Sequence, residues 1–134
     1  MATITRFEDL EIWQLARELA LEIFNTYTHA EPFSKDFSLK DQINAASGSV
    51  MDNIAEGFER NGRNEFRQFL SIAKGSCGEI KSQLYRALDR KYILQQHFDY
   101  LCSKADVLGK KIGAFMNYLA SSTHRGIKFK NKVN

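Results

Sequence analysis

The sequence predicts an all-α protein, folded as one up-down-up-down four-helix bundle. Three observations lead to this prediction. Along four stretches, apolar residues recur at alternating three- and four-residue intervals, which places them on one face of a helix. Short connections join these stretches, as in a bundle whose neighbouring helices are antiparallel. Pro32 is the only proline among 134 residues, which is too little loop-forming material for a β-sandwich with many turns.

The first helix is expected to begin within Thr5 to Asp9. Thr5 and Glu8 have the spacing of a capping box, and Asp9 is the rival cap. The helix then carries an apolar stripe formed by Ile12, Ala16, Leu19, Ile23 and Tyr27. Beside this stripe lies a second apolar row, Trp13, Ala20 and Phe24. This second row packs either against another helix of the bundle or against a second subunit.

A second helix is expected from about Leu39 to Phe58, after a loop over residues 29–37 and with Ser38 and Asp41 as its capping signal. Its core face consists of Leu39, Ile43, Ala46, Val50, Ile54 and Phe58. Asn53 falls on this buried side, where an unpaired polar group costs about 1 to 3 kcal/mol. We therefore expect Asn53 to bond to a neighbouring helix, and Asn53 and Glu56 to form a structural polar part of the core. The alternative is a catalytic or ligand-binding role for this pair.

Two further helices complete the bundle. The third begins at Gly62 to Glu65, after a turn at Asn61-Gly62, and runs to about Arg90. Its seam consists of Phe66, Phe69 or Leu70, Ala73, Cys77, Ile80, Leu84 and Ala87. The fourth follows a link over residues 91–96 and carries Phe98, Leu101, Ala105, Leu108, Ile112, Phe115 and Leu119. The bundle spans residues 1–121, and residues 122–134 form a basic tail that is expected to be mobile.

Glycines inside these helices predict close contacts between backbones. A glycine in a helix interior costs about 1 kcal/mol relative to alanine, so it indicates a position where another chain segment approaches. Gly48 in the second helix is expected to face Gly75 and Gly78 in the third. Gly109 and Gly113, four residues apart, predict a similar contact for the fourth helix.

Motifs for catalysis or metal binding are not recognisable. Cys77 and Cys102 lie far apart on apolar helix faces, which predicts buried free thiols rather than a disulfide. The three histidines share no ligand spacing, and no Gly-rich phosphate loop occurs. We expect a protein that is not an enzyme and has no metal or cofactor. The N-terminus has no apolar segment and no run of 18 apolar residues occurs, so a cytoplasmic protein without membrane contact is expected.

Charge is distributed unequally along the chain. Residues 1–59 hold four Lys and Arg against eleven acidic residues, a balance of −7, whereas residues 60–134 hold fifteen against five, a balance of +10. Three readings are open: acidic and basic helices pack together, subunits attract one another, or a basic surface binds a polyanion.

The basic residues form a pattern as well as an excess. Arg67, Lys74 and Lys81 recur every seven residues beside the apolar seam of the third helix. The candidate nucleic-acid-binding residues are these three together with Arg60, Arg63, Lys110 and Lys111. The alternative is that Arg67, Lys74 and Lys81 form ion pairs with acidic residues on neighbouring helices, such as Glu18, Glu22 or Asp52. Aromatic residues do not alternate with the basic ones, so any binding should depend on backbone and shape rather than on bases.

Three sequence blocks, in order, resemble a known family. They are Phe7-Glu8-Asp9-Leu10-Glu11-Ile12-Trp13, then Ser49-Val50 with Asn53-Ile54-Ala55-Glu56-Gly57, and then Glu65-Phe66 with Phe69 to Ser76. The chain resembles, from about Phe7 to Leu119, the small four-helix-bundle proteins first noticed as reading frames within intervening sequences of bacterial 23S ribosomal RNA. It departs from the common pattern at Gly62, where a Ser or similar cap is usual, and at Lys91, often a Gly.

The resemblance implies a ring, typically a homopentamer, with a basic surface proposed to hold nucleic acid. A related protein, the accessory protein of diversity-generating retroelements, works with a reverse transcriptase and its RNA. We therefore expect a non-enzymatic, oligomeric protein that binds RNA or DNA. The alternative is a structural assembly module with a protein partner, in which Trp13 and Phe24 serve subunit contacts. The dependence of binding on salt concentration distinguishes these two functions, because only polyanion binding should weaken steeply as salt increases.

Overall fold

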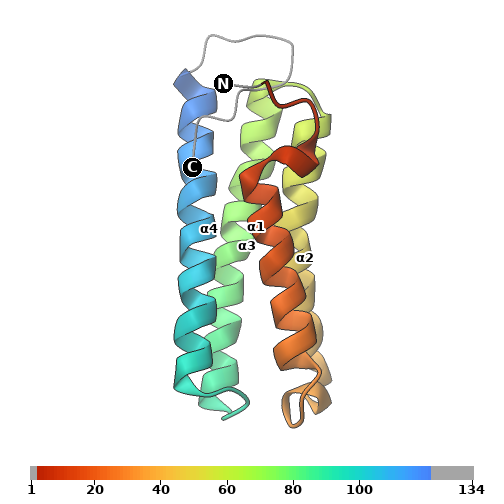
Figure 1. Cartoon of the computed structure of the whole chain (residues 1–134), viewed down its shortest axis with the longest axis vertical. Coiled ribbons are helices and arrows are strands. Elements are labelled where there is room, and N and C mark those ends of the chain that lie inside the picture. Colours follow the sequence, from red (N-terminus) through yellow and green to blue (C-terminus); the bar gives the residue numbers. More distant parts are fainter. Residues whose placement is uncertain (1–2, 122–134) are drawn as a thin grey trace.

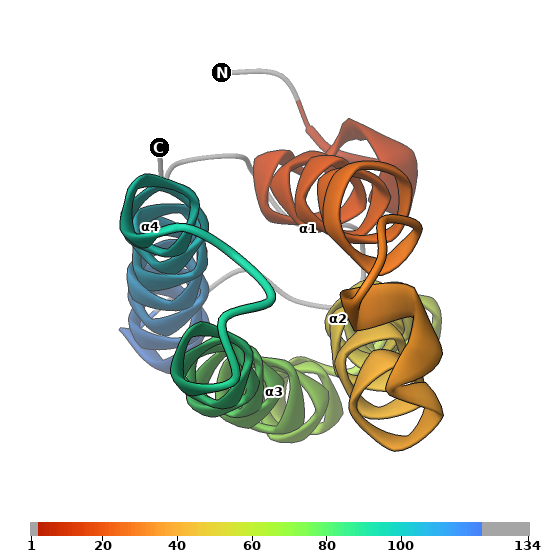
Figure 2. The same ribbon diagram turned by 90° about the horizontal axis from the view of Figure 1, so that it is seen from below.

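Four long helices form the part of the chain that the structure describes. The computed structural model describes residues 3–121, with helices α1 (Glu11–Glu22), α2 (Phe37–Glu59), α3 (Arg63–Asp89) and α4 (Gln95–Ser121). Each helix runs antiparallel to the preceding one (Figure 1), and the four surround a common axis in chain order (Figure 2). This arrangement confirms the predicted all-α, up-down-up-down bundle. The predicted mobile tail, residues 122–134, lies outside the described residues.

The predicted apolar stripes meet along the axis of the bundle. Phe33, Phe58, Phe66 and Phe115 are fully buried, and the rings of Phe58 and Phe115 each contact that of Phe66. The second row of α1 divides between two environments. Trp13 packs against the core and against Phe7, with 5.2 Å between ring centroids, whereas Phe24 remains 47% exposed. Trp13 is therefore partly buried within the subunit, whereas Phe24 is open to solvent.

The ends of the first helix differ from the prediction. A short 3-10 turn, η1 (Phe7–Asp9), precedes α1, and Leu10 occupies the cap position in an extended conformation without a capping side chain. Neither Thr5 nor Asp9 caps the helix, because Thr5 precedes η1, Asp9 is the last residue of η1, and Leu10 holds the cap position of α1. At its other end, α1 continues into a π-helical turn, η2 (Ile23–Thr28).

Asp36 begins the second helix. Its carboxylate accepts a hydrogen bond from the Leu39 backbone N–H at 3.1 Å, so the prediction of Ser38 as the cap is wrong. A short 3-10 turn, η3 (Phe33–Lys35), precedes the cap. Asp36 also accepts hydrogen bonds from Arg90 at 2.7 Å and from the Tyr92 hydroxyl at 2.8 Å. These partners come from the link between α3 and α4, which the local sequence around the cap does not reveal.

The link after α3 contains a residue in the left-handed region. Lys91 has a φ of 62°. Its backbone N–H donates to the Leu88 carbonyl, and that of Tyr92 donates to the Ala87 carbonyl, both at 2.9 Å. These two bonds define a Schellman motif with Lys91 at the position where glycine is most favourable. A glycine at this position, as the resemblance would lead one to expect, would adopt this φ without steric cost.

Asn53 is half-buried and bonds within its own helix. Its amide nitrogen donates to the Ser49 carbonyl at 2.8 Å and to the Ser49 hydroxyl at 3.0 Å. The Ser49 hydroxyl in turn bonds to that of Ser76 on α3 at 3.0 Å. The predicted direct bond from Asn53 to a neighbouring helix is wrong, since Ser49 makes the contact between helices instead.

Glu56 is not part of the core. Its side chain is 54% exposed and forms an ion pair with Arg60, one turn later, at 2.9 Å. This position corrects the expectation of a buried structural role, because Glu56 lies on the solvent side of α2 while Asn53 lies closer to α3.

The close approach of α2 and α3 occurs at a glycine other than those predicted. A Cβ atom on Gly57 would lie 2.6 Å from the Phe69 Cβ. At Gly48, Gly75 and Gly78 an added Cβ would meet nothing within 4 Å, so the prediction of a close contact there is wrong. These three positions lie on open sides of their helices, which the spacing of glycines alone does not distinguish from a helix interface.

Opposite charges join α1 to α4. Lys104 pairs with Glu22 at 2.9 Å, and Lys111 pairs with Glu11 at 3.0 Å. The Tyr100 hydroxyl also donates to Glu22 at 3.2 Å. Part of the charge asymmetry therefore reflects acidic and basic helices that pack together within one chain.

Candidate nucleic-acid interface

A groove runs along the surface between α3 and α4, and we call it the α3–α4 groove. One part of it has a volume of about 300 Å³ and is lined by Lys74, Cys77, Gly78, Lys81, Ala105, Asp106, Gly109 and Lys110. Toward the start of α3 it continues past Asn64, Arg67, Gln68, Ser71, Gly113, Ala114, Met116 and Asn117. The two parts share Lys74 and Lys110, so they form one continuous surface.

Helical geometry brings the basic side chains of α3 to this groove. Arg67, Lys74 and Lys81 are separated by two turns each, which corresponds to about 10.5 Å between successive positions along the helix axis. Lys110 reaches the same groove from α4. Asp106 is the one carboxylate among the groove-lining residues of the described chain, against these four cations. The lining therefore has a clear excess of positive charge.

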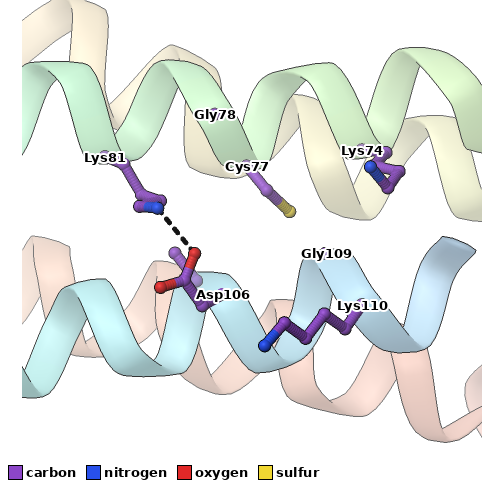
Figure 3. Close-up of a pocket in the computed structure, with 8 residues that line it drawn as sticks. Lys74, Cys77, Gly78, Lys81, Asp106, Gly109 and Lys110 are labelled. Atoms are coloured by element: carbon purple, nitrogen blue, oxygen red, sulfur yellow. Dashed lines mark ion pairs between the residues drawn. The ribbon is translucent and has the colours of Figure 1, made fainter.

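The four cations differ in what they contact. The Lys81 amino group lies 2.6 Å from the Asp106 carboxylate, and Figure 3 shows the two side chains meeting across the space between α3 and α4. This hydrogen bond to Asp106 raises the pKa of Lys81. Arg67 donates through Nε to the Met116 carbonyl at 3.3 Å. Within residues 3–121, Lys74 and Lys110 are exposed and form no ion pair, so both are available to a ligand.

Small residues form the floor of the groove. Gly109 lies against Cys77, where an added Cβ would be 3.7 Å from the Cys77 Cβ. At Gly113 an added Cβ would lie 3.1 Å from the Lys74 Cε, so the Lys74 side chain passes directly over this glycine. The contact at Gly109 is an ordinary van der Waals contact that leaves room for a Cβ, so the predicted close approach is not found there, whereas Gly113 makes room for a lysine stem. The missing side chains keep the groove open between its cations.

Cys77 points into the space between the two helices (Figure 3), but its chemistry is restricted. Burial raises the pKa of its thiol to about 11. A thiol with such a pKa stays protonated near neutral pH and is a poor nucleophile and metal ligand. Cys77 and Cys102 are both buried and free, as predicted from their places on apolar faces.

The groove brings together four of the seven basic residues that the sequence singled out: Arg67, Lys74, Lys81 and Lys110. The other three lie elsewhere. Lys111 turns toward α1 and pairs with Glu11, and Arg60 pairs with Glu56. Arg63 is the first residue of α3 and is not among the groove-lining residues.

The ion pairs of Arg67, Lys74 and Lys81 differ from the ones that the sequence offered as an alternative to nucleic-acid binding. Lys81 does pair, but with Asp106 rather than with the acidic residues of α1 or α2. Glu18 and Glu22 pair with Lys104 instead. Asp106 is the groove residue that sequence reasoning missed. Its position depends on the register between α3 and α4, and no local pattern in the sequence specifies that register.

Among residues 3–121, no group of three or more His, Cys, Asp or Glu is arranged to hold a metal ion. None of the described helices is long and apolar enough to cross a membrane. A catalytic role for Asn53 and Glu56 was the alternative considered from the sequence. Asn53 bonds to Ser49 and Glu56 pairs with Arg60, so each of the two side chains makes its own local contact.

Comparisons with known proteins agree with this architecture. The family model described as 23S rRNA-intervening sequence protein matches residues 8–114. A crystal structure of a protein of unknown function from the S23 ribosomal protein family of Bacteroides thetaiotaomicron is similar, with a TM-score of 0.73 and 22% identity. The match covers 79% of this chain and 95% of that one. A search of curated proteins gave no match.

Proposed function

The chain belongs to the 23S rRNA-intervening sequence protein family, and from this premise we propose that it is a non-enzymatic protein that binds nucleic acid through the α3–α4 groove. The observation that carries the proposal is the convergence of Arg67, Lys74, Lys81 and Lys110 against a single carboxylate. The ligand is the phosphate backbone of RNA or DNA.

Physical chemistry supports a backbone ligand rather than base recognition. Lys and Arg side chains that neutralise phosphates release condensed counterions, and this supplies affinity without regard to sequence. Base recognition on single strands generally requires aromatic side chains that stack on the bases. The groove-lining residues include no aromatic side chain. The groove should therefore recognise the shape and charge of a nucleic acid rather than its bases.

We further propose that the protein acts as a homo-oligomer, a pentamer by the resemblance to its family. Exposed apolar side chains support an interface, since Phe24 is 47%, Phe37 66% and Leu94 62% exposed. A ring would repeat the groove once per subunit and multiply the phosphate contacts along one nucleic acid. The same apolar residues support the second candidate function, an assembly module that binds a protein partner such as a reverse transcriptase.

Salt-dependent binding to a fluorescently labelled single-stranded RNA tests the proposal, with a DNA of the same sequence and a duplex in parallel. Each phosphate contact with a single strand contributes about 0.7 to the slope of log affinity against log salt. The double variant Lys74→Gln with Lys110→Gln removes two such contacts. We expect the magnitude of its slope to fall by about 1.4 relative to the parent protein.

A matched control keeps the net charge equal. Lys35→Gln with Lys40→Gln removes the same charge around the start of α2, away from the groove, and should leave the slope unchanged. Light scattering on the same samples gives the subunit number. An assembly whose mass does not change with nucleic acid at any salt concentration would refute the nucleic-acid proposal and favour the protein-partner module.

A further inference from the structure

Asp106 occupies an unusual place in the α3–α4 groove. It is the one acidic side chain among the groove-lining residues of the described chain, and it meets Lys81 of α3 one turn before Lys110 of α4. Lys110 follows Asp106 by four residues on α4, the spacing at which ion pairs form along a helix. The Asp106 carboxylate nevertheless contacts Lys81, across the groove, at 2.6 Å. Figure 3 shows this pair beside the remaining lysines of the groove.

The pair lies where a ligand can reach it. The side chains of Lys81 and Asp106 are 36% and 49% exposed. Ion pairs that are this open to solvent contribute little stability. A phosphate that enters the groove must therefore compete with the carboxylate for Lys81, since both groups are anions that accept hydrogen bonds from an ammonium group. Lys74 and Lys110, which hold no carboxylate within residues 3–121, would bind the flanking phosphates.

We propose that the Asp106 carboxylate stands in for one phosphate and thereby limits the affinity of the groove for a nucleic-acid backbone. The inference rests on the proposed function. In the parent protein, Lys81 is engaged by Asp106 and contributes little to binding, so Arg67, Lys74 and Lys110 supply the phosphate contacts. Asp106 is in this sense a residue that tunes affinity, and it favours a long strand, which is already held at neighbouring contacts, over an isolated anion.

The variant Asp106→Asn tests the proposal because it removes the charge and keeps the shape. Releasing Lys81 adds one phosphate contact, which strengthens binding of a single-stranded RNA about 8-fold at 50 mM salt and about 3-fold at 200 mM. The slope of log affinity against log salt should steepen by about 0.7. Adding Lys81→Gln to Asp106→Asn should cancel both gains.

Two comparisons separate this effect from a change in net charge. Asp52→Asn changes the charge equally at an exposed position of α2 and should leave the slope as it is in the parent protein. Lys81→Gln alone should weaken binding less than Lys74→Gln, since Lys81 is engaged in the parent protein. Circular dichroism at 222 nm confirms that each variant keeps its helices.

The possible outcomes are distinct. If the parent protein binds RNA but Asp106→Asn keeps the parental slope, or binds more weakly, the role of Asp106 is refuted while the proposed function stands. The role of Asp106 is also refuted if Asp52→Asn reproduces the gain, because the effect is then one of net charge. If the parent protein and Asp106→Asn both fail to bind at low salt, the proposed function and this inference fail together.

Discussion

Gly57 offers a sharp test of how α2 and α3 pack. A Cβ atom added there would lie 2.6 Å from the Phe69 Cβ and 2.9 Å from the Phe66 Cδ1. The Phe69 Cβ is attached directly to its backbone, so a new rotamer cannot move it away. The helices would have to separate by about 0.8 Å to restore the 3.4 Å of an ordinary contact. Gly57→Ala should therefore disturb the packing of the buried Phe58 and Phe66 rings.

The magnitude follows from two opposing effects. Overpacking a core of this kind costs up to about 3 kcal/mol. Alanine gains about 1 kcal/mol over glycine in a helix interior. We expect Gly57→Ala to lower the free energy of unfolding by about 2 kcal/mol. Gly48→Ala, in the same helix, is the matched control, because an added Cβ there meets nothing within 4 Å. It should raise the free energy of unfolding by about 1 kcal/mol.

Urea unfolding followed by circular dichroism measures both variants. The same substitution at two positions of one helix should then differ by about 3 kcal/mol and change sign, which corresponds to about 10 °C in melting temperature. Equal effects of the two substitutions would contradict the packing described for Gly57. A loss of stability in Gly48→Ala would contradict the open surface at that position.

Three further predictions concern the other features described. Lys91→Gly should raise the free energy of unfolding by about 1 kcal/mol, because glycine relieves the cost of a φ of 62°, and a loss of stability on urea unfolding would count against the Schellman motif. Gly113→Leu should displace Lys74 and weaken RNA binding about 8-fold at 50 mM salt in the anisotropy assay. Ala120→Leu, exposed near the end of α4, is its control, and equal losses would refute the role of Gly113. The Leu39 N–H, together with Tyr92 and Arg90, holds the pKa of Asp36 below its usual 3.8. The ionised carboxylate therefore stabilises the fold above pH 3.8, and this contribution is lost as the pH falls through the lowered pKa. The difference in free energy of unfolding between the parent protein and Asp36→Asn should therefore become smaller as the pH falls. A difference that does not change with pH would contradict this role of Asp36.

Local sequence patterns were sufficient for the helices but not for their contacts. Apolar spacing identified the four helices, because each helix buries one stripe of its own residues. The N-cap of α2 was assigned wrongly, since Asp36 is stabilised by Arg90 and Tyr92, which are more than 50 residues away. The role of the glycines was likewise misjudged. A glycine on an open face and one beneath a phenylalanine look the same in the sequence.

The candidate site was partly predictable for the same reason. Seven-residue spacing placed Arg67, Lys74 and Lys81 on one side of α3, and the structure brings them to the α3–α4 groove. The division between Lys110 and Lys111 depends on how α4 is rotated relative to α1 and α3. Adjacent residues on a helix point in different directions, and Lys111 contacts Glu11 while Lys110 faces the groove. The partner of Asp106 could not be assigned from the sequence, because the rotation of α4 was not known.

Lysine footprinting tests the central claim most directly. The protein is acetylated briefly with and without single-stranded RNA at low salt, and mass spectrometry measures the rate at each lysine. The account predicts that RNA slows the acetylation of Lys74 and Lys110 in the groove and leaves Lys35 and Lys91 unchanged. Equal rates with and without RNA at Lys74 and Lys110, or protection confined to lysines outside the α3–α4 groove, would contradict it.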